Sequence, residues 1–197
     1  MSYLDVEKIE QLANEVDLRP YNQHYRISDF DSGIPEYNEF IISYANDYST
    51  HSISQTQLLL NKKNSDIIGY ITLCTDSIKL KQDEKEKHEM EKIPFNSLPA
   101  LKIGKLAVDK RYLRRGYASF LILLARGIAL DLNERGIACR FITVDADIDY
   151  DPSTVDLYLK NGFTYNETER KKTRMKSMRL DILNHEDVEH QAEADIV

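Results

Sequence analysis

The chain has 197 residues, a formal net charge of −7 at pH 7 and 42% hydrophobic residues. That length fits one domain with a sizeable core, so we expect a single domain over 1–197, with its core at about 20–182. No stretch approaches the roughly 20 apolar residues of a membrane helix. The segment Met1–Val16 also lacks the basic-then-apolar order of a signal peptide, which predicts a cytoplasmic protein with no membrane association.

The negative charge is unevenly spread. Residues 183–197 carry five acidic side chains and no Lys or Arg, and removing those five charges from −7 leaves −2. This predicts an acidic, solvated tail. Cys74 and Cys139 fall within predicted strands and are expected to be buried apolar residues rather than a disulfide. The five histidines are scattered, so no metal site is predicted.

The first half of the chain predicts a mixture of helices and strands. A short helix is expected over Val6–Val16, an extended segment over Tyr25–Phe30 and a helix beginning near Pro35. Strands over Gln57–Asn61 and Ile67–Cys74 predict a hairpin. The segment Lys81–Lys92 mixes both charge signs without apolar periodicity, which is typical of a surface insertion between strands.

The second half alternates more clearly. Strands are predicted over Lys102–Val108, Cys139–Asp145, Thr164–Glu167 and Arg174–Leu180, and helices over Tyr117–Asn133 and Pro152–Lys160. The fold class is therefore α/β of the α+β type, with one mostly antiparallel sheet.

The segment Lys105–Ser119 is the most informative in the chain, because a strand runs through a basic turn directly into an apolar helix. Backbone N–H groups at such a turn, together with the helix dipole, favour a phosphate or pyrophosphate. Gly116 lets the backbone approach a ligand, Ala118 keeps the first helical turn uncrowded, and Arg114 and Arg115 add positive charge. Lys105 and Arg111 are further candidates for phosphate contact, or are simply solvated. Alone, such a turn also fits an ordinary loop.

Two motifs carry a family resemblance. Leu113–Ala118 resembles motif A of the GCN5-related N-acetyltransferases (GNAT), with Leu113 standing where Gln or Arg is usual. About forty residues later, Leu157–Phe163 resembles the family's helix end, in which Tyr158, Gly162 and Phe163 match. The chain is thus similar to this family over roughly residues 20–182.

The resemblance implies a sheet whose two middle strands splay apart, flanked by helices. It implies an acyl-coenzyme A-dependent N-acetyltransferase that passes an acetyl group from acetyl-CoA to a primary amine by direct attack in a ternary complex. The pantetheine would pair with the backbone of Leu106, Ala107 and Val108. The residues implied at the pyrophosphate are Arg114, Arg115, Gly116, Tyr117 and Ala118.

The resemblance also nominates Tyr158 as the catalytic acid that protonates the leaving thiolate. The alternative for Tyr158 is core packing. The general base stays open, because the resemblance implies either a carboxylate near the central strands or ordered water. Asp145 and Asp147, which follow a strand, are candidates that also fit turn-capping roles. Asp151 lies where many relatives have Asn.

Three functional alternatives stay open. The first is a non-catalytic module that binds CoA or a protein through the same fold. The second is a toxin-like acetyltransferase acting on aminoacyl-tRNA, because the segment 29–33 faintly resembles that branch. The predicted last hairpin is also basic, with Arg170, Lys171, Lys172, Arg174, Lys176 and Arg179. We favour the remaining alternative, a small-molecule or peptide amine as acceptor, with those cations protecting an edge strand. A homodimer stays open.

Overall fold

The computed structural model describes residues 4–166 and 174–183. Arg170, Lys171, Lys172 and the acidic residues of the predicted tail lie outside the described residues. Within these ranges seven strands form one sheet in the order β1-β2-β3-β4-β5-β7-β6. The strands are β1 (Val16–Pro20), β2 (Gln55–Asn61), β3 (Ile67–Lys79), β4 (Ser97–Val108), β5 (Phe141–Asp147), β6 (Thr164–Tyr165) and β7 (Met175–Asp181).

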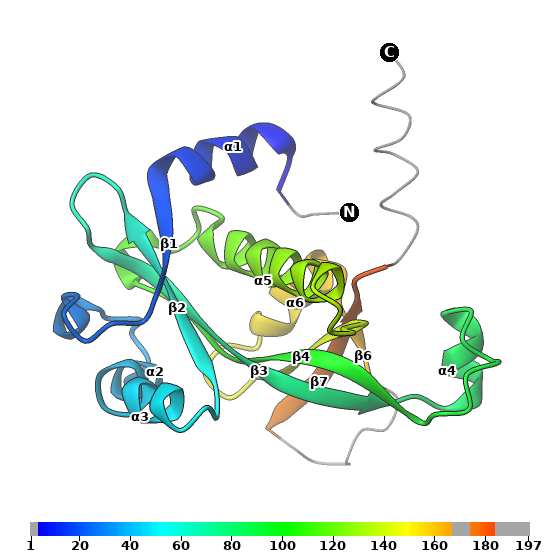
Figure 1. The fold of residues 1–197 in the computed structure, drawn as a ribbon. Coiled ribbons are helices and arrows are strands. Elements are labelled where there is room, and N and C mark those ends of the chain that lie inside the picture. The colour runs from blue at the N-terminus through cyan, green and yellow to red at the C-terminus, as the bar shows by residue number, and fades with distance from the viewer. Residues whose placement is uncertain (1–3, 167–173, 184–197) are drawn as a thin grey trace.

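Helices cover both faces of the sheet (Figure 1). On one face lie α1 (Val6–Glu15), α5 (Tyr117–Glu134) and α6 (Thr154–Lys160), which share the larger buried cluster with the strands. On the other face α2 (Pro35–Glu39), a π-helical turn η2 (Phe40–Tyr44) and α3 (Ala45–Thr50) follow one another and pack around buried Tyr70. Short 3-10 turns lie at η1 (Ile27–Asp29) and η3 (Lys110–Tyr112), and α4 (Gln82–Lys87) caps the long β3–β4 hairpin.

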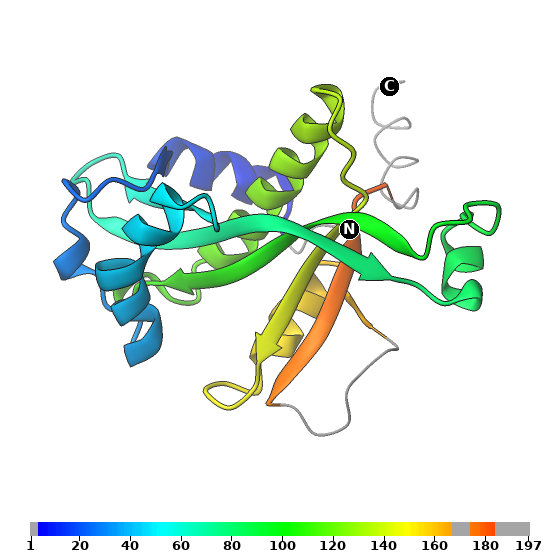
Figure 2. The same cartoon turned by 60° about the horizontal axis from the view of Figure 1, so that its bottom comes forward.

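The two middle strands pair over only part of their length. β4 and β5 run parallel and are in register from Ala100–Phe141 to Ile103–Val144, whereas the other neighbouring strands pair antiparallel. Beyond Ile103 the strands part, and Figure 2 shows β5 and β7 swinging away from β3 and β4. At this point the β3–β4 register jumps from Ile103 to Lys105, so Gly104 forms a bulge. The predicted fold, a mostly antiparallel sheet with splayed middle strands, is confirmed.

Helix α1 lies over the beginning of α5. Asp5 caps α1 by accepting a hydrogen bond from the Lys8 backbone N–H at 2.7 Å. Leu12 is buried against the core, and the Tyr117 hydroxyl donates to Glu15 at 2.9 Å. These contacts fix α1 on the turn that precedes α5.

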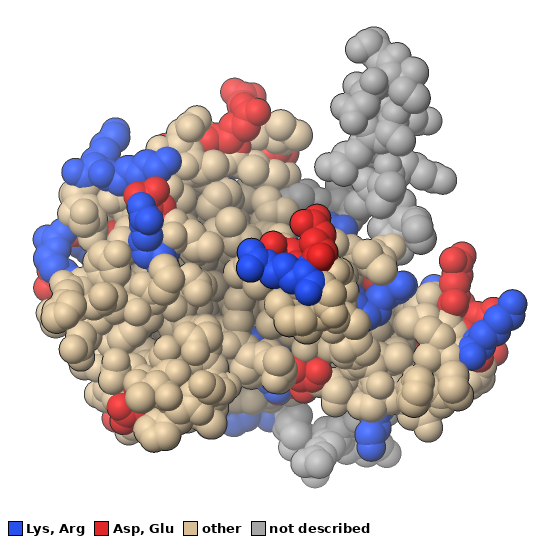
Figure 3. Space-filling model, viewed as in Figure 1, with Lys and Arg blue, Asp and Glu red and all other residues tan. Residues whose placement is uncertain are grey.

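The charged insertion is less solvated than its composition predicts. Figure 3 shows Lys, Arg, Asp and Glu side chains on the outer surface around α4, yet Glu84 and Lys85 are buried. Glu84 Oε1 lies 2.8 Å from a guanidinium nitrogen of Arg179, and both side chains are almost fully buried at 1% and 6% exposure. The expectation of a pure surface insertion is therefore wrong at these two residues, because a buried partner on β7 compensates for the charge of Glu84.

Four other differences from the sequence-based expectations are found. β1 was not predicted as a strand, and the segment predicted as extended at 25–30 contains the 3-10 turn η1. Both cysteines are free, Cys139 is buried and Cys74 is only half-buried. Arg179 is not part of a basic surface, because its guanidinium is enclosed beside Glu84.

Candidate active site

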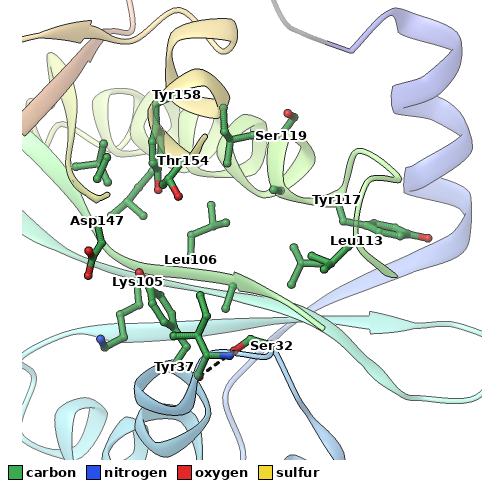
Figure 4. A pocket seen from close by; sticks show the side chains of 18 of the residues that line it. Ser32, Tyr37, Lys105, Leu106, Leu113, Tyr117, Ser119, Asp147, Thr154 and Tyr158 are labelled. Carbon is green, nitrogen blue, oxygen red and sulfur yellow. Dashed lines mark hydrogen bonds between the residues drawn. The ribbon is translucent and has the colours of Figure 1, made fainter. Parts of the chain in front are cut away.

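A cavity of about 410 Å³ opens where β4 and β5 part (Figure 4). One wall is the segment 103–108 of β4, and the opposite wall is the end of β5 at 144–147 together with α6. The turn before α5 closes one end. The cavity therefore runs from a helix N-terminus along an open strand to the gap between the strands.

The backbone of Leu106, Ala107 and Val108 lines this cavity. These residues pair with β3 on one side, and on the other side the described chain provides no β5 partner beyond Ile103. Strand N–H and C=O groups without a ladder partner are satisfied by an extended amide chain that adds to the sheet edge.

The turn places its three arginines differently. Arg114, in a left-handed conformation with φ 59°, lines the cavity. Arg115 is not among the cavity-lining residues, and its guanidinium lies 5.5 Å from the centre of the Tyr112 ring. Arg111 is held by the fully buried Asp109, whose Oδ1 accepts from Arg111 Nε at 2.9 Å. Arg114 is thus the arginine of this turn that reaches the cavity.

The structure gives two reasons for a glycine at position 116 that the sequence did not reveal. Its φ of +95° is one that residues with side chains rarely adopt. A Cβ there would lie 3.0 Å from Leu4 Cδ2 and 3.5 Å from Leu12 Cδ1, so α1 closes over the glycine. Ala118 lines the cavity, whereas the hydroxyl of Tyr117 is directed away from it toward Glu15 (Figure 4).

Tyr158 projects from α6 toward the gap between the strands (Figure 4). It is 4% exposed, and its ring makes an edge contact with Phe163 at 5.2 Å between centroids. Burial raises the pKa of its phenol well above the usual range, and the neighbouring Tyr37 raises it further. Tyr158 therefore stays protonated at neutral pH and has a proton to donate.

A second cavity of about 350 Å³ lies on the other side of the gap. Charged and aromatic residues line it, including Glu36, Lys102, Tyr150 and Arg174. Both cavities share six lining residues, which are Tyr37, Ile103, Gly104, Lys105, Asp145 and Asp147. The sequence did not single out Tyr37 as a site residue, because it belongs to a segment without a motif. Arg174 was noted only as part of the basic hairpin and not as a residue of this gap.

A sheet that parts beside a phosphate-type turn, with a protonated tyrosine at the gap, is the arrangement expected of acyltransferases that use coenzyme A. The sequence profile described as Acetyltransferase (GNAT) family matches residues 19–163, about three quarters of the chain. The chain belongs to the GNAT family and is an acetyltransferase, and the enzymes of this family use acetyl-CoA. No curated protein shows significant sequence similarity to it.

Several solved structures share the fold. A tyrosine-to-phenylalanine variant of the toxin AtaT is 17% identical with a TM-score of 0.71, covering 89% of this chain and 94% of that chain. A tyrosine-to-phenylalanine variant of KacT is 18% identical with a TM-score of 0.71, covering 88% of this chain and 99% of that chain. AtaT complexed with acetyl-methionyl-tRNAfMet is 20% identical with a TM-score of 0.69, covering 90% and 99%. At these identities the similarity shows the fold.

Two further observations concern membrane-spanning helices and metal sites. No helix in residues 4–166 or 174–183 is long and apolar enough to cross a membrane. Within the same ranges, no three His, Cys, Asp or Glu side chains are grouped as a metal site.

Proposed function

We propose that this protein transfers the acetyl group of acetyl-CoA directly to a primary amine in a ternary complex. The observation that carries this proposal is the continuous cavity from the turn before α5, along the open edge of β4, to Tyr158. Its lining fits a ligand with a diphosphate at one end and an extended amide chain behind it.

In this assignment the chain's backbone and one arginine bind the donor. The backbone of Leu106, Ala107 and Val108 pairs with the pantetheine amides. The N–H groups of the turn, from Arg114 to Ala118, and the Arg114 side chain bind the pyrophosphate. Tyr117 contributes its backbone, since its side chain is directed toward α1.

Tyr158 is the catalytic acid in this proposal. When the amine attacks the thioester carbonyl, the C–N bond forms and the C–S bond breaks, and coenzyme A leaves as a thiolate. The Tyr158 hydroxyl donates its proton to that sulfur. We call the first cavity, from the turn before α5 to Tyr158, the donor cavity. A direct transfer is favoured because neither Cys74 nor Cys139 lines it.

The test measures acetyl-CoA binding by calorimetry and acetyl transfer to a panel of amines. The panel contains hydroxylamine, amino-acid esters, polyamines, peptides and charged tRNA. We expect binding and transfer to at least one amine. Tight binding with no transfer to any of them would instead support the non-catalytic module.

A second candidate acceptor is the α-amino group of an aminoacyl-tRNA. Two observations favour it over other macromolecules. Three cationic side chains, Lys102, Lys105 and Arg174, line the second cavity. The similar structures include toxins, one of them bound to an acetylated methionyl-tRNA. Transfer to methionyl-tRNA that exceeds transfer to methionine methyl ester at equal concentration, and that falls steeply with salt, would support this acceptor.

The cellular context and the oligomeric state stay proposals as well. We infer a cytoplasmic location, where acetyl-CoA is available, and leave the homodimer as a prediction for sedimentation measurements. The expectation that the basic hairpin is not a tRNA site also stays a prediction, now limited to Arg174 and Lys176 among the described residues.

A further inference from the structure

The two cavities meet at the gap between β4 and β5, so the acetyl group and the acceptor amine meet there too. Four of the six shared residues carry ionisable side chains, namely Tyr37, Lys105, Asp145 and Asp147. Two of these are carboxylates, which can receive a proton from the amine. The sequence leaves Asp145 and Asp147 equivalent, but the structure does not.

Asp145 already has a close cationic partner. Its Oδ2 lies 2.6 Å from the Nζ of Lys102, and its side chain is 38% exposed. The ion pair raises the pKa of Lys102 against the effect of burial. A carboxylate held by an adjacent lysine and open to solvent is less available to an incoming ammonium group.

Asp147 has a different environment. Its side chain is 9% exposed, and Oδ1 accepts a hydrogen bond from the backbone N–H of Asp149 at 3.1 Å. The contact from Oδ2 to Arg174 is 3.5 Å, whereas the Nε of Arg174 lies at 3.0 Å from Asp149. A charged contact of 3.5 Å is beyond the usual hydrogen-bond length, so Oδ2 can accept a closer donor.

Tyr37 reaches the same place from α2. It lines both cavities, and Figure 4 shows its ring directed toward the gap that Tyr158 enters from the opposite side. Burial raises the pKa of the Tyr37 phenol, and the negative charges of Asp147 and Glu36 raise it further. The phenol therefore keeps its proton and is a donor beside a carboxylate.

We propose that Asp147 is the catalytic residue that binds the acceptor's ammonium group and takes the proton lost from the nitrogen, and that Tyr37 is its positioning residue. This inference rests on the proposed function. Asp147 first takes one proton from the bound ammonium and passes it to solvent, which leaves the neutral amine. As the C–N bond forms, a second N–H proton passes to Asp147, and as the C–S bond breaks, the Tyr158 proton passes to sulfur. The proton on Asp147 then returns to the Tyr158 phenolate through the hydroxyl of Tyr37, which restores both groups.

Several charged or titratable groups from its own and other elements face Asp147. These groups are Glu36 and Tyr37 from α2, Lys102 and Lys105 from β4, Asp145 from its own strand, Asp149 and Tyr150 from the following turn, and Arg174 before β7. The Lys105 ammonium is 4.9 Å from the centre of the Tyr37 ring and 5.2 Å from that of Phe40.

The experiment compares Asp147→Asn with the matched control Asp145→Asn, using two nucleophiles. A substantial fraction of methionine methyl ester is an ammonium ion at neutral pH, whereas hydroxylamine is largely neutral and needs no proton removed before it attacks. For Asp147→Asn we expect kcat/KM with the ester to fall about 100-fold to 10,000-fold, and to fall much less with hydroxylamine. Acetyl-CoA affinity stays unchanged.

Two further readouts separate a catalytic role from a structural one. The defect of Asp147→Asn with the ester shrinks as the pH rises through the pKa of the amine, about 8 for an α-amino group, because more amine is then already neutral. Asp147→Glu partly restores transfer. Tyr37→Phe, which removes the phenol beside Asp147 and with it the proposed proton relay, lowers transfer to the ester about tenfold and spares hydroxylamine.

Several results would overturn the assignment. These are equal losses with both nucleophiles, an equally large loss in Asp145→Asn, or full activity of Asp147→Asn. Wild-type transfer to hydroxylamine without any transfer to the ester would overturn the ammonium-binding role. If the wild-type protein acetylates neither nucleophile nor binds acetyl-CoA, the proposed function fails, and this assignment fails with it.

Discussion

The two ends of the β4–β5 pair differ in how they are closed. From Ala100 to Ile103 the strands pair. An apolar cluster from the β3–β4 hairpin and Phe141 closes that end, together with the buried ion pair between Glu84 of α4 and Arg179 of β7. From Gly104 onward the strands part, and cavities rather than side chains fill the space between them. The same two strands therefore provide rigidity at one end and a binding site at the other.

This contrast shows why the open end holds its shape. Strands that part expose backbone groups and lose ladder hydrogen bonds, which is unfavourable unless the rest of the pair is firmly held. At the closed end His88 and Arg140 both contact Asp181, at 2.7 Å and 2.8 Å. We infer that the closed end determines stability and the open end determines chemistry, and each of the following changes tests one side of that division.

The largest effect is expected at the open end from Tyr158→Phe. The change keeps the ring that packs on Phe163 and removes the proton donor. Turnover should fall about 100-fold to 10,000-fold, with kcat and kcat/KM lowered together. Steady-state kinetics with hydroxylamine measure this, and calorimetry should show unchanged acetyl-CoA affinity. A loss below about threefold at every pH would make Tyr158 a packing residue.

At the closed end, Glu84→Gln should destabilise the fold without altering chemistry. The change leaves the guanidinium of Arg179 buried without its carboxylate. Breaking a buried pair in this way costs about 3–5 kcal/mol of unfolding free energy, measurable by urea titration. The control is Glu86→Gln, an exposed glutamate on the same helix. Equal stability of the two variants would contradict a role for α4 in closing this end.

The closed end should also weaken in acid. Burial alone would raise the pKa of Asp181, but hydrogen bonds from His88, Arg140 and the Leu183 backbone lower it to about 2, from 3.8. Because the folded-state pKa is lowered, the contribution, about 2 kcal/mol, is complete above pH 4 and lost as the pH falls through about 2. The difference in unfolding free energy between wild type and Asp181→Asn should therefore narrow over that range. A constant difference would mean that Asp181 does not titrate there.

The smallest effect is expected on acetyl-CoA affinity, when two adjacent arginines at the open end are compared. Arg114 lines the donor cavity and Arg115 packs on Tyr112, so Arg114→Gln should weaken acetyl-CoA binding about tenfold and Arg115→Gln much less. Calorimetry on both variants gives the comparison. Similar losses would mean that the turn acts through its total charge rather than through one directed side chain.

The sequence allowed the donor side to be predicted further than the acceptor side. The turn at 113–118 lies in one continuous segment where backbone geometry requires a glycine and a small residue at fixed spacing, so a motif is visible. The acceptor side draws residues from α2, β4, β5 and the segment before β7. Tyr37 and Arg174 become neighbours of Asp147 only through the fold, and no local pattern indicates such contacts.

The errors in the secondary structure predicted from the sequence have similar causes. β1 is a five-residue strand that follows α1 without a break, so Val16 fitted the end of a helical pattern. The mixed charges at 81–92 are typical of a solvated segment, yet Lys85 donates to the Ile93 carbonyl at 2.9 Å and Glu84 meets Arg179 from far along the chain. Long-range pairing of charges cannot be read from local composition.

The position of α1 has a practical consequence for how this enzyme is dissected. The family similarity begins at residue 19, but the outer wall of the donor turn is Leu4 and Leu12, which precede it. A shortened protein that starts at the similarity boundary would keep every motif residue and still lose the support beneath Gly116. The limits of the similarity therefore do not define the smallest unit able to bind the donor.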